Sequence, residues 1–326
     1  MTAKQPNRIK ALEFYSGIGA FAQAARVNDI EVLAAFDQSQ WANQVYAQNY
    51  NHKPVSRNLD SISINDIPDA DLWWLSPPCT PYSRRGEQKD MADPRAKSFL
   101  HLIDFMVVKK PPIILLENVE GFLDSKMYEH LCQTLQGERY QVSTIRLCPT
   151  MFGVPMLRPR IFVVASLVDR FSTPLLSAPQ PTSRMALSQF IDAGLNDSPA
   201  GSEMLLSEAD AIKYEAVLNV VDLKDVSDAD SYLICFTSGY FRCRKASGSL
   251  LRLESGRLRF FSPREILALL RFAPNFSLSD LDLPICYRLV GNSVDVRAID
   301  YLLSRVEPAN LKSQRTREKT RRQDGS

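Results

Sequence analysis

The first half of the chain alternates short apolar runs with segments whose apolar residues recur at helical spacing. Runs of the first kind predict buried strands and cover residues 9–14, 32–36, 72–75, 112–116, 141–148 and 161–167. Segments of the second kind predict helices and cover residues 20–27, 40–49, 99–108 and 127–136. Strands that alternate with helices favour an α/β fold with a mostly parallel sheet.

A glycine turn joins the first strand to the first helix, with the sequence Ser16-Gly17-Ile18-Gly19. Glycines at such a turn let the backbone approach a ligand closely while the helix amino terminus faces it. The next strand ends at Asp37, a carboxylate placed to bind a ribose diol. Asp37 could equally cap the helix over residues 40–49. The turn and Asp37 together favour a nucleotide-type ligand.

Cys79 follows the strand over residues 72–75, beyond the sequence Ser76-Pro77-Pro78. The two prolines end the strand abruptly, so they present the thiol just outside its carboxyl end. In an open parallel sheet, ligands bind in the crevice at this edge. A cysteine is often a buried packing residue, but its place after the prolines favours a reactive thiol.

Charged residues occur at two further strand ends. Glu117 follows the strand over residues 112–116, so its carboxylate is expected in the same crevice as Cys79. Arg158 and Arg160 stand one residue apart where the last strand begins. Their side chains project to the same side and can grip an anionic or carbonyl-bearing ligand, although arginines at strand starts are often only solvent-exposed.

The second half of the chain is less regular. Residues 169–202 are rich in Pro, Ser, Ala and Thr, which predicts a domain boundary. Residues 239–248 interleave Tyr240 and Phe241 with Arg242, Arg244 and Lys245. This pattern suits stacking on bases and neutralising phosphates, or it forms a charged hairpin. The sequence Ser262-Pro263-Arg264-Glu265 predicts a helix start, and Gly291-Asn292-Ser293-Val294 leads into a last helix that ends near Arg305.

The totals narrow the class of protein. The 326 residues are 45% apolar and 23% charged, with no uninterrupted apolar stretch long enough to span a membrane and no signal-peptide core. We therefore expect a cytoplasmic protein without a membrane partner.

Six cysteines form no CxxC pair and only three histidines are present, so we expect reduced thiols and no metal. The net charge is +2, but residues 312–322 carry six basic residues against one acidic residue, as a solvated tail or a nucleic-acid contact would.

Five short motifs in a fixed order resemble the cytosine-5 methyltransferases that use S-adenosylmethionine. They are Phe14–Gly19, Pro77–Cys79, Glu117–Val119, Arg158–Arg160 and Gly291–Val294, and they cover nearly the whole chain. The resemblance implies an S-adenosylmethionine-dependent methyltransferase fold, Rossmann-like, with helices on both faces of a mostly parallel sheet and a small target-recognition lobe.

The resemblance also implies a division into domains. Residues 1–170 and 284–311 would form a discontinuous catalytic and cofactor-binding domain, because the last helix of this family returns to the large domain. Residues 171–283 would form the target-recognition lobe. For residues 312–326 the excess of basic residues, and not the resemblance, predicts a disordered tail.

Within the family the chain is most similar to the tRNA-methylating subgroup, often called DNA methyltransferase homologue 2. The similarity rests on Cys235-Phe236-Thr237 and on the run from Arg84 to Leu102. It implies methyl transfer to C5 of a cytosine in tRNA, with the anticodon loop of tRNA-Asp expected, by a monomer. The predicted substrate-binding residues are Cys235, Phe236, Thr237, Arg84 and Arg95. Thr80 and Tyr82 depart from the subgroup, which typically has Gln and Phe at these positions.

The resemblance gives roles to the site residues. Cys79 would add to C6 of cytosine, protonated Glu117 would bind N3, Arg160 would hold O2, and Arg158 would support Arg160. The residues implied to bind S-adenosylmethionine are Phe14, Ser16, Gly17, Ile18, Gly19, Asp37, Gln38, Asn58, Leu59, Pro78, Asn292, Ser293 and Val294.

Three other functions share some of these features. A DNA cytosine-5 methyltransferase would perform the same chemistry on a flipped base, but the lobe is small for duplex recognition. A non-catalytic nucleic-acid-binding protein would not need Cys79, Glu117 and both arginines together. A nicotinamide dehydrogenase would require glycine at position 22, which is Ala22.

Overall fold

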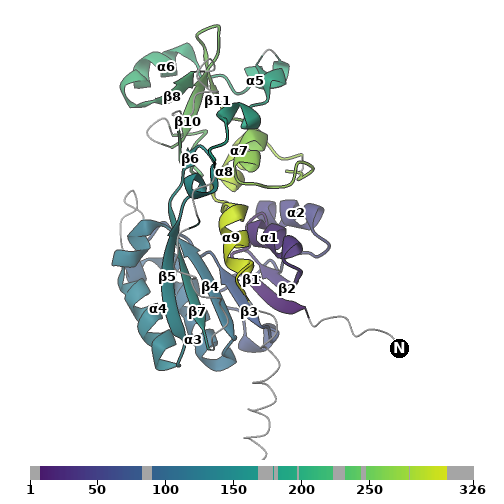
Figure 1. Cartoon of the computed structure of the whole chain (residues 1–326), viewed down its shortest axis with the longest axis vertical. Coiled ribbons are helices and arrows are strands. Elements are labelled where there is room, and N and C mark those ends of the chain that lie inside the picture. The colour runs from purple at the N-terminus through teal and green to yellow at the C-terminus, as the bar shows by residue number, and fades with distance from the viewer. Residues whose placement is uncertain are drawn as a thin grey trace, which may run out of the picture.

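A six-stranded sheet forms the centre of the large domain in the computed structural model, which describes residues 8–82, 90–167, 179, 183–196, 198–222, 232–243, 247–278 and 280–306 (Figure 1). The strand order is β2-β1-β3-β4-β7-β5. The strands are β1 (Ile9–Phe14), β2 (Ile30–Phe36), β3 (Leu72–Leu75), β4 (Ile113–Asn118), β5 (Gln141–Leu147) and β7 (Arg160–Ser166). All six lie where the apolar runs predict strands.

Strand direction decides which residues meet at the edge of this sheet. The pairs β1–β2, β1–β3 and β3–β4 are parallel, whereas β7 is antiparallel to both β4 and β5. An antiparallel strand begins at the edge where its parallel neighbours end. The start of β7 therefore lies beside the end of β4, with Asn118 opposite Ile161 and Glu117 opposite Phe162.

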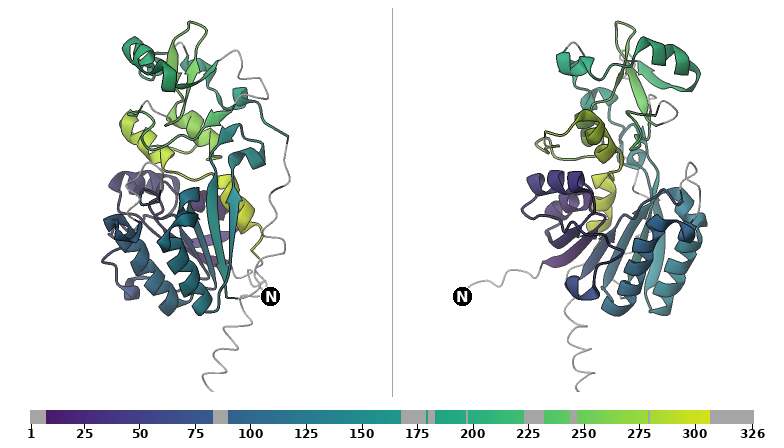
Figure 2. Two further views of the ribbon diagram at one scale, coloured as in Figure 1. Left: turned by 90° about the vertical axis from the view of Figure 1, so that its left-hand side faces the viewer. Right: turned by 180° about the vertical axis from the view of Figure 1, so that it is seen from behind.

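Helices cover both faces of the sheet (Figure 2). One face packs against α1 (Ala20–Val27), α2 (Gln40–Asn49) and α9 (Val296–Leu303), and the other against α3 (Lys97–Lys109) and α4 (Lys126–Gly137). The alternation of side chains along each strand supplies both apolar surfaces. Trp74 joins the first cluster, and its neighbour Trp73 joins the second.

The second lobe lies beyond one end of the sheet (Figure 1). It contains a three-stranded sheet of β8 (Asn219–Asp222), β10 (Ser249–Arg252) and β11 (Leu258–Phe260). A parallel two-stranded ribbon pairs β6 (Met156–Leu157) with β9 (Leu233–Ile234). The helices of this part are α5 (Pro199–Ser202), α6 (Glu208–Tyr214), α7 (Pro263–Leu269) and α8 (Leu283–Gly291).

The two aromatic residues of the segment 239–248 pack inward and do not form the base-stacking surface that was one of its two interpretations. Tyr240 is buried, and its hydroxyl donates to the carbonyl oxygen of Ser249. The Phe241 ring stacks on Tyr287 at 4.7 Å. Both rings therefore belong to an aromatic core beneath the lobe. Arg244 and Lys245 lie outside the described residues.

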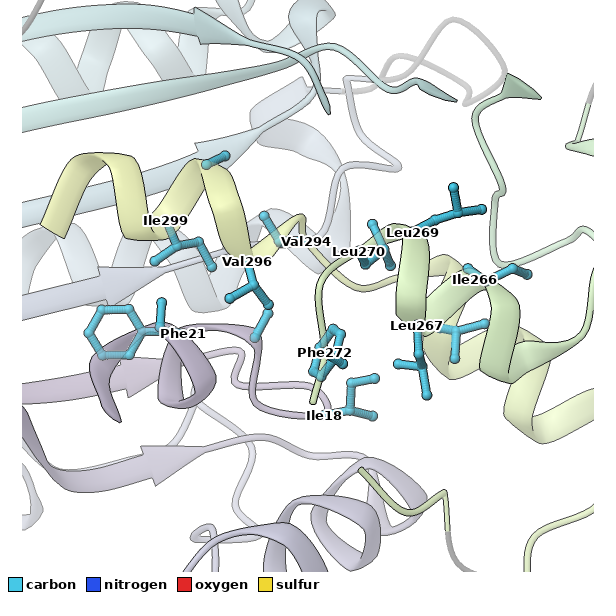
Figure 3. Close-up of a cluster of buried hydrophobic side chains, with 14 of the residues drawn as sticks. Ile18, Phe21, Ile266, Leu267, Leu269, Leu270, Phe272, Val294, Val296 and Ile299 are labelled. Atoms are coloured by element: carbon cyan, nitrogen blue, oxygen red, sulfur yellow. The ribbon is translucent and has the colours of Figure 1, made fainter. Parts of the chain in front are cut away.

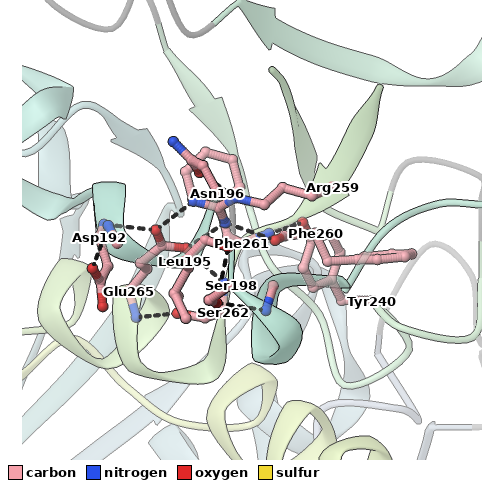
Figure 4. Close-up of polar contacts among 12 residues, drawn as sticks. Asp192, Leu195, Asn196, Ser198, Tyr240, Arg259, Phe260, Phe261, Ser262 and Glu265 are labelled. Atoms are coloured by element: carbon pink, nitrogen blue, oxygen red, sulfur yellow. Dashed lines mark hydrogen bonds and ion pairs between the residues drawn. The ribbon is translucent and has the colours of Figure 1, made fainter. Parts of the chain in front are cut away.

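A buried ion pair fixes the start of α7. The Arg259 guanidinium contacts Glu265 at 2.8 Å, with the two side chains 0% and 2% exposed (Figure 4). Glu265 also accepts from the backbone N–H of Ser262, whose hydroxyl accepts from the N–H of Glu265. This reciprocal capping box is the helix start that the sequence predicts.

The chain returns to the large domain through α9. Figure 3 shows Val294, Val296 and Ile299 packed between α1 and the α7 segment. The N–H of Val296 donates to the carbonyl oxygen of Leu270 at 3.0 Å. This packing holds the segment before α9 against the carboxyl edge of the sheet.

The described part of the chain offers neither a membrane-spanning helix nor a cluster of metal ligands. None of its helices is long and apolar enough to cross a membrane. Its His, Cys, Asp and Glu side chains form no group of three or more that could hold a metal ion. The predicted tail, residues 312–326, lies outside the described residues.

Candidate active site

A cavity of about 530 Å³ opens at the carboxyl edge of the large sheet. Its walls come from the glycine turn after β1, the end of β2, the Cys79 loop after β3, Glu117 on β4 and residues 291–294 before α9. The volume falls within the roughly 300–1,000 Å³ of small-molecule sites. Residues far apart in sequence thus surround one space because their strands end at one edge.

The glycine turn has the backbone that its sequence predicts. Gly17 and Gly19 have φ angles of 53° and 88°, a left-handed conformation that glycine adopts without strain. A Cβ atom on Gly19 would lie 2.3 Å from the Tyr50 ring, whereas one on Gly17 would meet nothing within 4 Å. Gly19 therefore allows the turn to pack against α2, and Gly17 leaves open space beside the cavity.

Asp37 pins this turn to the end of β2. Its two carboxylate oxygens accept backbone N–H groups, one from Gly17 and one from Ser39, both at 2.8 Å. The cap of α2 is Ser39, whose hydroxyl accepts from the N–H of Ala42. Asp37 is therefore not the helix cap. Burial raises the pKa of its carboxyl group, and the bonds from Ser39 and Gly17 oppose that rise.

Most of the residues predicted to bind the cofactor line the cavity. They are Ser16, Gly17, Ile18, Asp37, Gln38, Asn58, Leu59, Pro78, Asn292, Ser293 and Val294. Three buried oxygens of lining residues have no hydrogen-bond partner within the protein: Glu13 Oε1, Ser16 Oγ and Ser293 Oγ. A buried polar atom without a partner costs free energy, so these atoms fit a ligand with several polar groups.

Phe14 and Gly19 are the exceptions. Phe14 is fully buried on the opposite face of the sheet, where its ring stacks on Phe36 at 5.0 Å. Successive strand residues point to opposite faces, so Phe14 turns away while Glu13 and Tyr15 line the cavity. The Phe14 side chain therefore takes no part in the cavity wall, whereas Gly19 contributes through the shape of the turn.

The sequence reasoning missed Glu13 and Tyr15 as cavity residues. The available signal was a single carboxylate, Glu13, inside the otherwise apolar strand over residues 9–14. Glu13 is 1% exposed and accepts from the Tyr46 hydroxyl at 2.8 Å. Burial raises the pKa of Glu13 to about 8, against the opposing effect of the Tyr46 hydrogen bond.

Cys79 lies in the cavity wall with an exposed side chain. The carbonyl oxygen of Pro77 accepts from the Asn118 amide at 3.3 Å, and the N–H of Tyr82 donates to the Cys79 carbonyl at 3.0 Å. These bonds fix the loop on both sides of the thiol. The surrounding protein desolvates the sulfur and raises the pKa of Cys79, while the positive charge of Arg160 lowers it in part.

Glu117 and Arg160 form an ion pair at the same end of the cavity. Arg160 Nε lies 3.1 Å from Glu117 Oε1, with the side chains 17% and 10% exposed. Because Glu117 is opposite Phe162 in the antiparallel ladder, Arg160 is its diagonal neighbour on the same face. Burial raises the pKa of Glu117, and Arg160 and then Arg158 oppose that rise.

Comparison with known proteins identifies the family. The family model described as C-5 cytosine-specific DNA methylase matches residues 9–307 of the chain. The chain belongs to this family. It is 30% identical to a tRNA (cytosine(38)-C(5))-methyltransferase of Bos taurus, over 90% of this chain and 98% of that protein. A protein of the same name from Schizosaccharomyces pombe is also 30% identical, over 93% of this chain and 98% of its own length.

One further similar protein has DNA in its name, and another has a solved structure. A protein of Dictyostelium discoideum named DNA (cytosine-5)-methyltransferase is 28% identical, over 91% of this chain and 93% of its own. The solved structure of a methyltransferase from Entamoeba histolytica is 27% identical and has a TM-score of 0.81, over 91% of this chain and 97% of that one. The chain is therefore a cytosine-5 methyltransferase with the S-adenosylmethionine-dependent, Rossmann-like fold of its family.

In this methyltransferase, the Arg158 side chain donates hydrogen bonds to the backbone where its own segment meets residues 236 and 291–293. Its two terminal nitrogens donate to the carbonyl oxygens of Phe236, Gly291 and Ser293, at 2.6, 3.1 and 2.5 Å. One of them also contacts the Cys235 sulfur at 3.1 Å. All four terminal N–H donors of Arg158 are thus used within the protein. The fifth donor, Nε, is buried without a hydrogen-bond partner.

The residues predicted to bind the substrate lie in different parts of the structure. Phe236 is 1% exposed and its ring packs against Tyr240, so the ring belongs to the core of the lobe. Cys235 lies beside the arginines, and the carbonyl of Thr237 lies against Gly291. Arg95 lines the cavity, with its guanidinium held by Asp93 at 2.7 Å. Arg84 lies outside the described residues.

The two departures from the subgroup are compatible with this site. The Tyr82 ring is buried and meets Phe122 edge-on at 4.9 Å, so it fills an aromatic packing position as phenylalanine would. Thr80 lines the cavity beside Cys79.

Proposed function

We propose that this methyltransferase transfers a methyl group from S-adenosylmethionine to C5 of a cytosine in tRNA, through a covalent bond between Cys79 and C6. The observation that carries the chemistry is the presence of Cys79, Glu117 and Arg160 in the wall of one cavity. The names of the bovine and fission-yeast relatives support tRNA as the substrate.

The chemistry starts from the low nucleophilicity of C5. Addition of the Cys79 thiolate to C6 forms an S–C6 bond, and a proton or hydrogen bond from Glu117 at N3 takes up the electron density. C5 then has enamine character and attacks the methyl group. S-adenosylmethionine supplies that methyl group as a sulfonium and leaves as S-adenosylhomocysteine. Loss of the C5 proton and breaking of the S–C6 bond restore the ring and free Cys79.

The environment of Glu117 suits the protonated form that this role requires. The side chain is 10% exposed, and burial raises the pKa of its carboxyl group. Arg160 lies on the same side and would hold the O2 oxygen of cytosine, where negative charge develops during the addition. The positive charge of Arg160 also favours the Cys79 thiolate. It lowers the pKa of Cys79, whereas desolvation by the surrounding protein raises that pKa.

The cofactor would occupy the part of the cavity between the glycine turn and residues 292–294. Asp37 would accept from the ribose hydroxyls, because each carboxylate oxygen keeps a lone pair after accepting one backbone N–H. The unpartnered oxygens of Glu13 and Ser293 would meet polar groups of the methionine end. Asn58 and Leu59 would border the adenine ring.

An RNA loop is the favoured source of the target base. The base must leave its stack to expose its ring, which costs a few kcal/mol in a duplex and less in a single-stranded loop. The anticodon loop of tRNA-Asp is therefore the proposed target. Duplex DNA is the alternative substrate, because the Dictyostelium relative has DNA in its name.

A direct assay separates the two substrates. The protein is incubated with labelled S-adenosylmethionine and either unmodified tRNA-Asp transcript or cytosine-containing duplex DNA, and the modified base is mapped by bisulfite sequencing. We expect one methylated anticodon-loop cytosine and no turnover by Cys79→Ala. Transfer to DNA but not to tRNA would overturn the proposed substrate, and turnover by Cys79→Ala would overturn the covalent mechanism.

A further inference from the structure

A second cysteine lies beside the catalytic arginines. The ribbon of β6 and β9 pairs Leu157 with Ile234, so the residues that follow, Arg158 and Cys235, are neighbours across it. The Cys235 sulfur lies 3.1 Å from one terminal nitrogen of Arg158 and 3.8 Å from one of Arg160. Two cationic donors thus converge on one sulfur, the arrangement that stabilises a thiolate.

We propose that Cys235 is present as a thiolate that serves as the counter-ion of Arg158 and Arg160 and positions Arg160 in the active site. The role assigned to Arg160 rests on the proposed function. In this arrangement Cys235 acts through the arginines and does not touch the reacting base, so it is a positioning residue.

The charges around Cys235 support this assignment. Burial opposes ionisation of the thiol, but the charges of Arg158 and Arg160 outweigh it and lower the pKa of Cys235. The acidic groups that face the same arginines are Glu117 and Cys79, and the pKa of each is raised. Asp295, beyond Arg158, is paired with Arg297 at 3.1 Å. Cys235 is therefore an acidic group whose ionisation the two guanidiniums favour, next to Glu117 and Cys79.

This counter-ion has a consequence for Glu117. Without an anion at Cys235, both guanidiniums would act on Glu117 and Cys79 alone and would favour their ionised forms. Ionised Glu117 cannot donate a proton to N3 of cytosine. The Cys235 thiolate thus favours the protonated form of Glu117, while Arg160 stays oriented between Glu117 and Cys235.

The first test measures the thiolate without substrate or cofactor. The far-ultraviolet absorbance of the thiolate is recorded at neutral pH for the wild type and for Cys235→Ser, Cys79→Ser and Cys286→Ser. We expect the band of about one thiolate to disappear only in Cys235→Ser. Cys286 is a matched control, because it is buried and contacts the Leu281 carbonyl with no arginine beside it in the described structure. An unchanged band in Cys235→Ser, or its loss in Cys79→Ser, would refute the proposal.

The second test reads the pH profile of kcat with the nucleic acid that the assay above identifies. Cys235→Ser should lose activity at lower pH than the wild type, by about one pH unit, because removing the anion lowers the pKa of Glu117. Cys235→Asp restores a negative charge and should bring the profile back toward the wild type. Folding of each variant is checked by its melting temperature. Equal profiles in the wild type and Cys235→Ser would contradict the proposal, whichever nucleic acid is the substrate.

Discussion

Arg160 Nε lies 3.1 Å from Glu117 Oε1 at the floor of the active site, although 42 residues separate them in the chain. The pair forms because β7 runs antiparallel to β4 and begins where β4 ends. The carboxyl group that donates a proton in the proposed mechanism is thus held beside the guanidinium that is proposed to bind an oxygen of the same base. The geometry of this pair leads to the first prediction.

Glu117→Gln should lower kcat by roughly 10² to 10⁴, because the amide cannot supply a proton to N3 in the transition state. The measurement is the initial rate of methyl transfer under saturating cofactor. The affinity for S-adenosylhomocysteine, measured by calorimetry, should stay close to that of the wild type. A wild-type kcat in this variant would remove Glu117 from the mechanism.

A fluorinated base should trap the Cys79 adduct. When C5 of the target cytosine carries fluorine, the proton that must leave after methyl transfer is absent, so the S–C6 bond cannot break. Protein and RNA should therefore migrate as one covalent species on a denaturing gel. Cys79→Ala should give no such species, and its formation by that variant would place the nucleophile elsewhere.

Gly291→Ala should disturb the contact between the lobe and the segment that closes the cavity. A Cβ atom at Gly291 would lie 2.3 Å from the Thr237 carbonyl oxygen and 2.6 Å from the Ser238 nitrogen. Both are backbone atoms and cannot rotate away, so we expect a loss of about 1–3 kcal/mol in the free energy of unfolding and a lower kcat. Urea denaturation and the methylation rate measure the two effects.

Gly137→Ala is the matched control for that substitution. A Cβ atom there meets nothing within 4 Å. The variant should gain about 0.4–1 kcal/mol, because the unfolded chain loses conformational freedom. Similar losses in both variants would mean that the contact at Gly291 does not set the effect.

The buried pair of Arg259 and Glu265 should be a major determinant of lobe stability. Arg259→Met leaves the Glu265 carboxylate buried without its partner, which should cost about 3–5 kcal/mol of the free energy of unfolding. Arg271→Met, at an ion pair of the same 2.8 Å length with a half-exposed arginine, should cost at most about 1 kcal/mol. Comparable losses in urea denaturation would contradict the dominance of burial.

Glu13 should make stability depend on pH. Burial raises the pKa of its carboxyl group from the ordinary value of 4.5 to about 8, against the Tyr46 hydrogen bond. Between these values the folded state keeps a proton that the unfolded state releases, so its contribution to the free energy of unfolding falls as pH rises. The fall should be on the order of a few kcal/mol and should vanish in Glu13→Gln. Glu31→Gln, at an exposed position on β2, should keep the wild-type dependence.

The elements of the large domain and several residues of the site follow from local sequence patterns. The apolar runs located all six strands of the large sheet, and the pattern is plainest in β1, β3, β4 and β7, where burial is nearly continuous. The prolines after β3 and the glycines after β1 marked their turns, since backbone conformation depends on local residue type. Cys79 and Asp37 follow parallel strands and Glu117 lies near the end of one, and those positions predicted a shared edge.

Which side chains meet depends on the tertiary structure. The antiparallel direction of β7 brings Arg160 to Glu117, and the pairing of β6 with β9 brings Arg158 to Cys235. Both depend on hydrogen bonds between segments distant in the chain, which leave no mark in either segment alone. Phe14 turned away from the cavity because strand register sets its face, and the aromatic residues 240 and 241 entered a core that several segments build together. Local pattern thus fixed the elements, and long-range pairing assembled the chemistry.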